Sequence, residues 1–331
     1  MYPSSPKQVI DAAGTAAFLV SNLTNIRYLT DVDMSAGFLL ITPRRITLFA
    51  DSRYSEEAAK NVRKGIAVQP CKQLQNSLAK VQSCGCESDV VTLAQLGRWK
   101  RKFKNTKFVQ KEGIIEEFRR TKEPAELRKF RRAQSMTQQV LRKVPRELKE
   151  GISEKQLARK LRDFAEKLGA DSLSFDPIVA FGTHTSRPHH HPTDRKLQKG
   201  HLVQIDMGAR YKGYCADQSA VFFTGPKTSK QERAYRAVTE AKSAATALVR
   251  DGVSTHDLDS AARAVLREYG YEKSFMHSLG HGVGLDIHEG VTLSVRAPEL
   301  FLRKGEIVTI EPGVYFEGQF GIRLEDELIV Q

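Results

Sequence analysis

The chain contains 331 residues and carries a formal net charge of +13, with 40% hydrophobic and 27% charged residues. This composition excludes disordered, collagen-like and membrane-embedded proteins, and the length predicts a globular protein of two domains. Four cysteines are too few for a disulfide scaffold of this size, so we expect ordinary thiols.

The first long uncharged stretch, residues 12–26, is too short and too polar to span a bilayer. The residues before it also lack the pattern of a signal peptide, because Lys7 is followed by Asp11 before the first apolar run. We therefore expect a cytoplasmic protein with no membrane anchor.

Short apolar runs separated by turn signals fill the next segment. They predict strands at 17–20, 26–29, 37–41 and 46–49, and a helix over 56–63. Together with a boundary near Gly113, this pattern predicts a small α/β domain at the start of the chain.

The positive charge is concentrated between Arg98 and Lys143, where 16 Lys and Arg residues accompany 5 Asp and Glu residues. Within this segment, basic and apolar residues alternate at helical spacing from Leu127 onward, which indicates an amphipathic surface helix from Pro124 to about Lys143. We interpret the charge as a solvated helix face and expect no nucleic-acid partner; phosphate binding is the alternative.

The second half of the chain repeats itself. Residues 197–208 align without gaps with residues 302–313, and Gly151-Ile152-Ser153 corresponds to Gly252-Val253-Ser254. Each copy is predicted to contain a helix, a loop and a β-hairpin, so we expect two copies of one α/β unit related by a pseudo-two-fold axis.

Each copy ends in a pair of carboxylates on a predicted hairpin. A turn centred between residues 211 and 212 would place Asp206 directly opposite Asp217, and a turn shifted by one residue would leave them on the same face. Glu311 and Glu325 flank Gly318 symmetrically, so an odd-length loop there also pairs them. Four half-buried acids repel one another unless a cation joins them or they take up protons. Metal ions fit best, and oxygen-rich ligation favours Mn²⁺, Mg²⁺ or Co²⁺.

Histidines and glycines gather in residues 275–289. The residues are His277, His281 and His288, with Gly280, Gly282 and Gly284. The glycines argue against a helix and for a backbone that passes close to another group, while one imidazole could complete a metal shell and others could stabilise an oxyanion. His189, in a run of three histidines, is a fourth candidate, although such runs are often solvated loop.

These residues resemble the pita-bread metallopeptidases, specifically the Xaa-Pro aminopeptidase and prolidase branch. Residues 25–30 and 48–54 are similar to the branch's amino-terminal domain, and its five metal-ligand motifs occur in order with family-like spacing. The resemblance implies an α/β (α+β) protein: a pita-bread (creatinase/aminopeptidase) catalytic domain over 119–331 with an internal repeat, preceded by a creatinase-like α/β domain over 1–118.

The resemblance also implies a site with two divalent metal ions, Mn²⁺ in the first place and Co²⁺ or Zn²⁺ as alternatives. Asp217 and Glu325 would bridge both ions, Asp206 would hold one, and His281 with Glu311 the other. Glu311 would also shuttle protons. The family motifs place four more residues near the substrate or the second bridging acid: His189, His277, His288 and Arg323.

The function implied is that of a homodimeric Xaa-Pro aminopeptidase, which removes the residue before a proline through a hydroxide held between the metal ions. A prolidase acting on Xaa-Pro dipeptides is the alternative within the branch. Methionine-type aminopeptidases share the catalytic fold, but the separate amino-terminal domain argues against them. An alternative of another class is an inactive pita-bread binding module or a metal-free relative such as creatinase. Such relatives have lost metal ligands, whereas this chain retains all five metal-ligand residues.

Overall fold

The computed structural model describes residue 3 and residues 5–331. It divides into two compact units, Met1–Arg119 and Arg120–Gln331, which we describe separately. Within the described residues, no helix is both long and apolar enough to cross a membrane.

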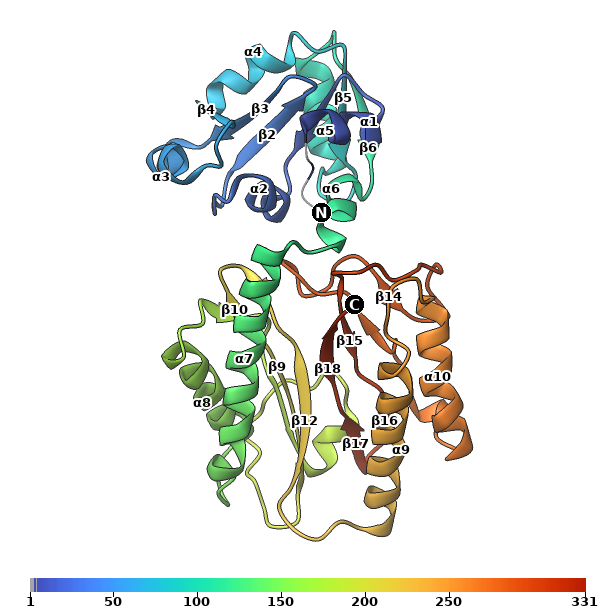
Figure 1. The fold of residues 1–331 in the computed structure, drawn as a ribbon. Helices are drawn as coiled ribbons and strands as arrows, with labels where there is room; N and C mark the ends of the chain where they lie inside the picture. The colour runs from blue at the N-terminus through green and yellow to red at the C-terminus, as the bar shows by residue number, and fades with distance from the viewer. Residues whose placement is uncertain (1–2, 4) are drawn as a thin grey trace. The chain divides into compact units, whose positions relative to one another are not determined.

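The first unit is built on a six-stranded sheet of order β4-β3-β2-β1-β5-β6 (Figure 1). Its strands are β1 (Ala17–Val20), β2 (Gly37–Thr42), β3 (Arg45–Ala50), β4 (Ala67–Pro70), β5 (Ser83–Glu87) and β6 (Lys107–Lys111). Its helices are α1 (Pro6–Ala13), α2 (Leu23–Thr30), α3 (Ser55–Asn61), α4 (Leu74–Leu78), α5 (Leu93–Lys102) and α6 (Ile114–Arg120).

Three of the four predicted strands of this unit and its predicted helix are confirmed, whereas the strand predicted at 26–29 is wrong. Those residues belong to α2, because the Asn22 side chain accepts hydrogen bonds from the Thr24 and Asn25 backbone amides and starts a helix. Ile26 and Leu29, three residues apart, are then both fully buried on the same helix face.

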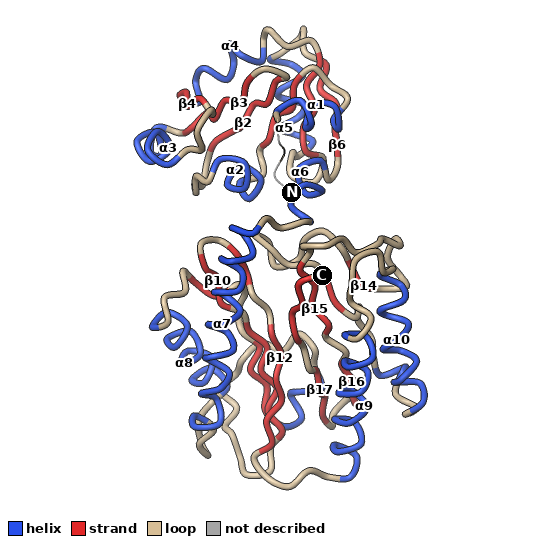
Figure 2. Tube along the Cα trace, in the orientation of Figure 1, coloured by secondary structure: helices blue, strands red, loops and turns tan. Residues whose placement is uncertain are grey.

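The second unit contains four helices that flank a group of short strands (Figures 1 and 2). The helices are α7 (Pro124–Glu147), α8 (Glu154–Lys167), α9 (Ser229–Thr246) and α10 (Thr255–Glu268). The strands are β7 (Ser172–Leu173), β8 (Ile178–Phe181), β9 (Leu202–Met207), β10 (Ala209–Tyr211), β11 (Tyr214–Cys215), β12 (Gln218–Phe223), β13 (Gly280–His281), β14 (Thr292–Leu293), β15 (Ile307–Ile310), β16 (Gly313–Phe316), β17 (Phe320–Arg323) and β18 (Asp326–Ile329).

Each copy of the repeat buries its own hydrophobic core. In the first copy, α7 and α8 pack against β8 and β9. In the second, α9 and α10 pack against β15, β16 and β17. The amphipathic helix predicted from Pro124 is confirmed as α7, whose apolar residues from Phe130 to Val144 are buried while Arg128, Arg131 and Arg132 are exposed.

The first acidic hairpin turns one residue later than the turn that would place Asp206 directly opposite Asp217. Lys212 and Gly213, with φ of 48° and 87°, form the turn, and Ser219 lies opposite Asp206. Of the two turns considered, the structure has the shifted one, so Asp206 does not lie directly opposite Asp217. The two acids occupy diagonal positions on one face of the hairpin.

The second acidic hairpin follows the predicted register. Gly318, with φ of 68°, occupies the centre of the loop, and Phe316 pairs with Phe320. Farther along, Gly313 pairs with Arg323 and Ile310 with Asp326, so the same register places Glu311 across from Glu325.

Gly208 permits the first hairpin to close around its acids. A Cβ at this position would lie 1.5 Å from the Ala216 carbonyl oxygen, so any side chain forces the two strands apart. We expect Gly208→Ala to lower the free energy of unfolding by about 4 kcal/mol in urea titrations, because backbone atoms cannot yield to the clash. Gly318→Ala, the control, meets no atom within 4 Å and should cost only about 1–2 kcal/mol of left-handed strain; equal losses would contradict this account.

Candidate active site

All nine residues singled out in the sequence line one cavity of the second unit, with a volume of about 560 Å³. Short strands and their ends supply most of them: Asp206 lies on β9, His281 ends β13, Arg323 ends β17, and the three other acids lie directly beside strands. Loops supply His189, His277 and His288. The wall of the cavity also includes the apolar side chains of Phe175, Ile178 and Ile287.

Asp217, His281 and Glu325 form the centre of the acidic cluster, because each offers a ligand atom within 4.8 Å of the other two. The His281 Nε2 atom lies 3.5 Å from Asp217 Oδ2 and 3.7 Å from Glu311 Oε1. The other ring nitrogen, Nδ1, is 3.1 Å from the Gly282 carbonyl oxygen and donates to it. The Nε2 lone pair therefore faces the carboxylates, as a metal ligand requires.

The acids of the cluster must either take up protons or be joined by a cation. Burial and the neighbouring acids raise the pKa values of Asp217 and Glu325 well above their usual range, and burial raises the pKa of Glu311 to about 8. Three buried oxygens, Asp206 Oδ1, Asp217 Oδ1 and Glu325 Oε1, have no hydrogen-bond partner among the residues that the structure describes. Burial also lowers the pKa of His281 to about 3, which keeps its imidazole neutral. These unpartnered donor atoms fit divalent cations.

Arg323 neutralises one member of the cluster. Its side chain is almost fully buried and donates to Asp206 Oδ2 at 2.5 Å and to Ser219 Oγ at 3.0 Å. One oxygen of Asp206 is therefore held by the guanidinium, while the other is unpartnered. This arrangement fixes the orientation of Asp206 toward the cavity.

Tyr315 is a site residue that the sequence reasoning missed. Its hydroxyl accepts from Arg323 Nη1 at 2.7 Å and lies 2.9 Å from His277 Nε2. Since His277 Nδ1 donates to the Ser278 carbonyl oxygen at 2.8 Å, the tyrosine hydroxyl donates to Nε2. Alternation along the strand could have revealed Tyr315, which shares the face of Glu311.

The four histidines differ in their availability to a ligand. Burial lowers the pKa of His277 to about 4, and both of its ring nitrogens are engaged by the protein. By contrast, His189 and His288 are exposed within the cavity wall, and neither ring hydrogen-bonds to any residue in the described part of the chain. The structure thus leaves His189 and His288, rather than His277, able to donate to a bound molecule.

The glycines of the histidine segment lie where a backbone passes close to its neighbours. A Cβ on Gly280 would lie 2.0 Å from the Thr309 carbonyl oxygen, and one on Gly284 would lie 1.9 Å from Glu289 Oε1. The expectation of a non-helical, closely approached backbone is confirmed, since only β13 and a loop form here. This packing holds His281 against β15.

Two family models together match most of the chain. Metallopeptidase family M24 matches residues 128–331, and the Creatinase/Prolidase N-terminal domain matches residues 7–121. The Xaa-Pro dipeptidase of Pyrococcus horikoshii is 31% identical over 98% of this chain and 92% of its own length.

Two solved structures match over nearly their whole length. The Xaa-Pro dipeptidase from Bacillus anthracis has a TM-score of 0.94 and 30% sequence identity, over 98% of this chain and 94% of that one. The X-Pro aminopeptidase from Thermotoga maritima has a TM-score of 0.89 and 31% sequence identity, over 98% of this chain and 95% of that one.

Proposed function

Because this chain belongs to metallopeptidase family M24, we propose that it is an Xaa-Pro aminopeptidase, which removes the amino-terminal residue that precedes a proline. Membership confirms the resemblance, the fold class and the enzymatic nature predicted from the sequence. The preference for longer peptides over dipeptides rests on the cavity, and prolidase activity is the alternative.

One observation supports a substrate longer than a dipeptide. A dipeptide carries a free carboxylate beside the scissile bond, and a site for it needs a cationic partner. Among the described residues that line the cavity, Arg323 is the sole Lys or Arg, and its N–H groups are directed at Asp206, Ser219 and Tyr315. A peptide that continues past the proline does not present that charge.

We assign the metal ligands to the acidic cluster: Asp206, Asp217, His281, Glu311 and Glu325. Unpartnered buried oxygens and a neutral imidazole support this set. When bound, two divalent cations lower the pKa of a water molecule and polarise the substrate carbonyl. We favour Mn²⁺ because four of the five ligands are carboxylates.

The chain's own residues supply proton transfer and orientation. Glu311 lines the cavity beside His281, where its carboxyl would take up a proton and pass it to the leaving proline nitrogen. His189 and His288 donate to the substrate carbonyl as its charge develops. The Arg323–Tyr315–His277 chain holds the neighbouring wall in place.

The specificity is tested by hydrolysis of matched substrates, Xaa-Pro and Xaa-Pro-Yaa, after loading with Mn²⁺, Co²⁺ or Zn²⁺. We expect release of the first residue from the tripeptide with a kcat/KM at least about tenfold above that of the dipeptide. Cleavage of the dipeptide alone would contradict the aminopeptidase proposal and select a prolidase.

Removing the Tyr315 hydroxyl should slow catalysis without emptying the metal site. Tyr315→Phe leaves His277 Nε2 without its donor and removes the 2.7 Å acceptor of Arg323 Nη1, so we expect kcat to fall about tenfold while KM changes little. Metal content, measured by atomic emission, should stay at the wild-type value. A variant with unchanged kcat would show that this hydrogen-bond chain does not support the site.

A further inference from the structure

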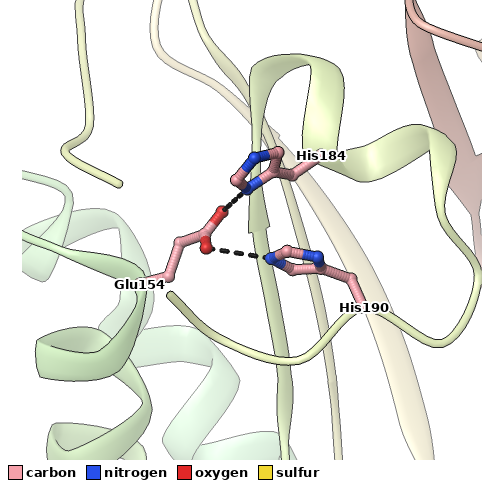
Figure 3. Close-up of side chains that lie close together, drawn as sticks. All are labelled: Glu154, His184 and His190. Carbon is pink, nitrogen blue, oxygen red and sulfur yellow. Dashed lines mark hydrogen bonds and ion pairs between the residues drawn. The ribbon is translucent and has the colours of Figure 1, made fainter. Parts of the chain in front are cut away.

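Three ionisable side chains form a compact cluster outside the catalytic cavity (Figure 3). Glu154 is the first residue of α8, His184 lies in the 3₁₀ segment Gly182–Ser186, and His190 lies in the loop that follows it. The His184 Nδ1 and His190 Nε2 atoms are each 2.9 Å from a different oxygen of Glu154. Both Glu154 and His190 are buried, with side-chain exposures of 0% and 3%.

The Glu154 carboxylate is fully occupied by hydrogen bonds. Besides the two imidazoles, it accepts from the Phe181 amide, the Thr193 amide and the Thr193 hydroxyl. Burial by itself raises the pKa of Glu154, but the hydrogen bonds from His190, Thr193 and Phe181 outweigh it and lower the pKa to about 2. The carboxylate is thus ionised, the imidazoles donate to it, and a metal ion here would have to displace them. These contacts are those of a fully satisfied hydrogen-bond network rather than of an open metal site.

The Glu154 carboxylate is not needed to start α8. The Ser153 hydroxyl and the Gln156 side chain already form a complete capping box for α8. In the second copy of the repeat, Thr255 takes the place of Glu154, and α10 begins there without an acidic side chain at that position. The bonds of the Glu154 carboxylate all go instead to residues between Phe181 and Thr193.

That segment carries His189 into the catalytic cavity. The residue before it is held from one side, because the Pro188 carbonyl oxygen accepts from Arg323 Nη1 at 3.3 Å. The residue after it is held from the other side, by the bond from His190 to Glu154. His189 itself lines the cavity between these two anchors.

We propose that Glu154 and His190 are positioning residues, which form a clamp that holds His189 against the substrate. This inference rests on the proposed peptidase function and on contact between His189 and the substrate carbonyl. A loop histidine with free ring nitrogens stabilises developing charge only if its backbone is fixed, since misplacement by about 1 Å can cost a large part of the rate.

Substitutions at His190 test the clamp. His190→Met keeps the approximate size but removes the donor, and we expect kcat to fall about tenfold with a smaller change in KM. His190→Gln restores an N–H near the Nε2 position and should recover activity to within about threefold of wild type. His184→Met is the matched control, because it removes a 2.9 Å bond to the same carboxylate five residues away from His189; we expect kcat within about twofold of wild type.

A double-mutant cycle separates positioning from general destabilisation. In the His189→Ala background, adding His190→Met should lower kcat no further, because the group that the clamp positions is already absent. The same loss in both backgrounds, or an equal loss in His184→Met, would overturn the proposal.

A readout that does not depend on catalysis keeps this test distinct from the test of the proposed function. In histidine-labelled wild type and variants, the His189 ring resonances should shift or broaden in His190→Met and stay in place in His184→Met. Unchanged His189 resonances in His190→Met would refute the clamp whether or not the wild-type protein cleaves Xaa-Pro peptides.

Discussion

Glu325→Ala is expected to abolish metal binding and peptidase activity together. Glu325 is 2% exposed and shares the centre of the cluster with Asp217 and His281. Its Oε1 atom has no hydrogen-bond partner in the described part of the chain. If Glu325 is a ligand of the divalent cations, as we propose, its loss would remove the stabilisation that they supply to developing charge, so kcat/KM should fall by at least about 10³-fold. Metal content and peptide release are measured on the same preparation.

Glu327→Gln is the matched control for this variant. Glu327 is an equally buried carboxyl two residues along the chain, but it lies outside the catalytic cavity. Burial raises the pKa of Glu327 well above its usual range. The protonated Glu327 side chain and the glutamine amide that replaces it are therefore similar in shape and charge. The control should retain metal and activity; retained activity in Glu325→Ala would refute the bridging assignment.

Arg323→Met should damage both stability and catalysis. The substitution leaves Asp206 without its cation and Tyr315 and Ser219 without their donor. Breaking a buried ion pair in this way costs about 3–5 kcal/mol of unfolding free energy, measured by urea denaturation of the metal-free protein.

Activity separates the two roles of Arg323. We expect kcat/KM of the metal-loaded Arg323→Met variant to fall about 100-fold, because both Asp206 and the Tyr315–His277 pair lose their fixed orientation. Arg323→Lys keeps the charge but not the planar fork, so it should recover stability more than activity. Equal recovery of both would show that charge alone explains the residue.

The register of the two acidic hairpins shows how far the sequence determines the site. Gly318 lies midway between Glu311 and Glu325 and has a left-handed backbone conformation. The pairing of these two acids therefore followed from their equal distance from the turn. In the first hairpin, Tyr211-Lys212 and Lys212-Gly213 are both feasible turns, and the choice between them depends on positive φ at both turn positions, which Gly213 favours.

The helix Leu23–Thr30 depends on a local signal that the predicted strand at 26–29 ignored, whereas two contacts of the second unit could not be derived from local patterns. The Ile26 to Leu29 run is equally compatible with a strand and with a short helix, and the Asn22 cap decides between them. The contacts of Tyr315 with His277, and of Glu154 with His190, join residues separated by 38 and 36 positions. Such contacts follow only from the tertiary arrangement.

Several expectations stay predictions. They include the domain boundaries at 1–118 and 119–331, which limited proteolysis would test. They also include the homodimer, the cytoplasmic location and the preference for Mn²⁺ over Co²⁺ or Zn²⁺. Light scattering of the metal-loaded protein addresses the homodimer directly.

A metal titration of the apoprotein with an Xaa-Pro-Yaa substrate tests the central claim most directly. Hydrolysis should rise with added Mn²⁺, Co²⁺ or Zn²⁺ and reach its plateau at about two equivalents per chain, as two ions held by one acidic cluster require. Absence of hydrolysis at every ratio, with two equivalents of metal shown to be bound, would contradict the account.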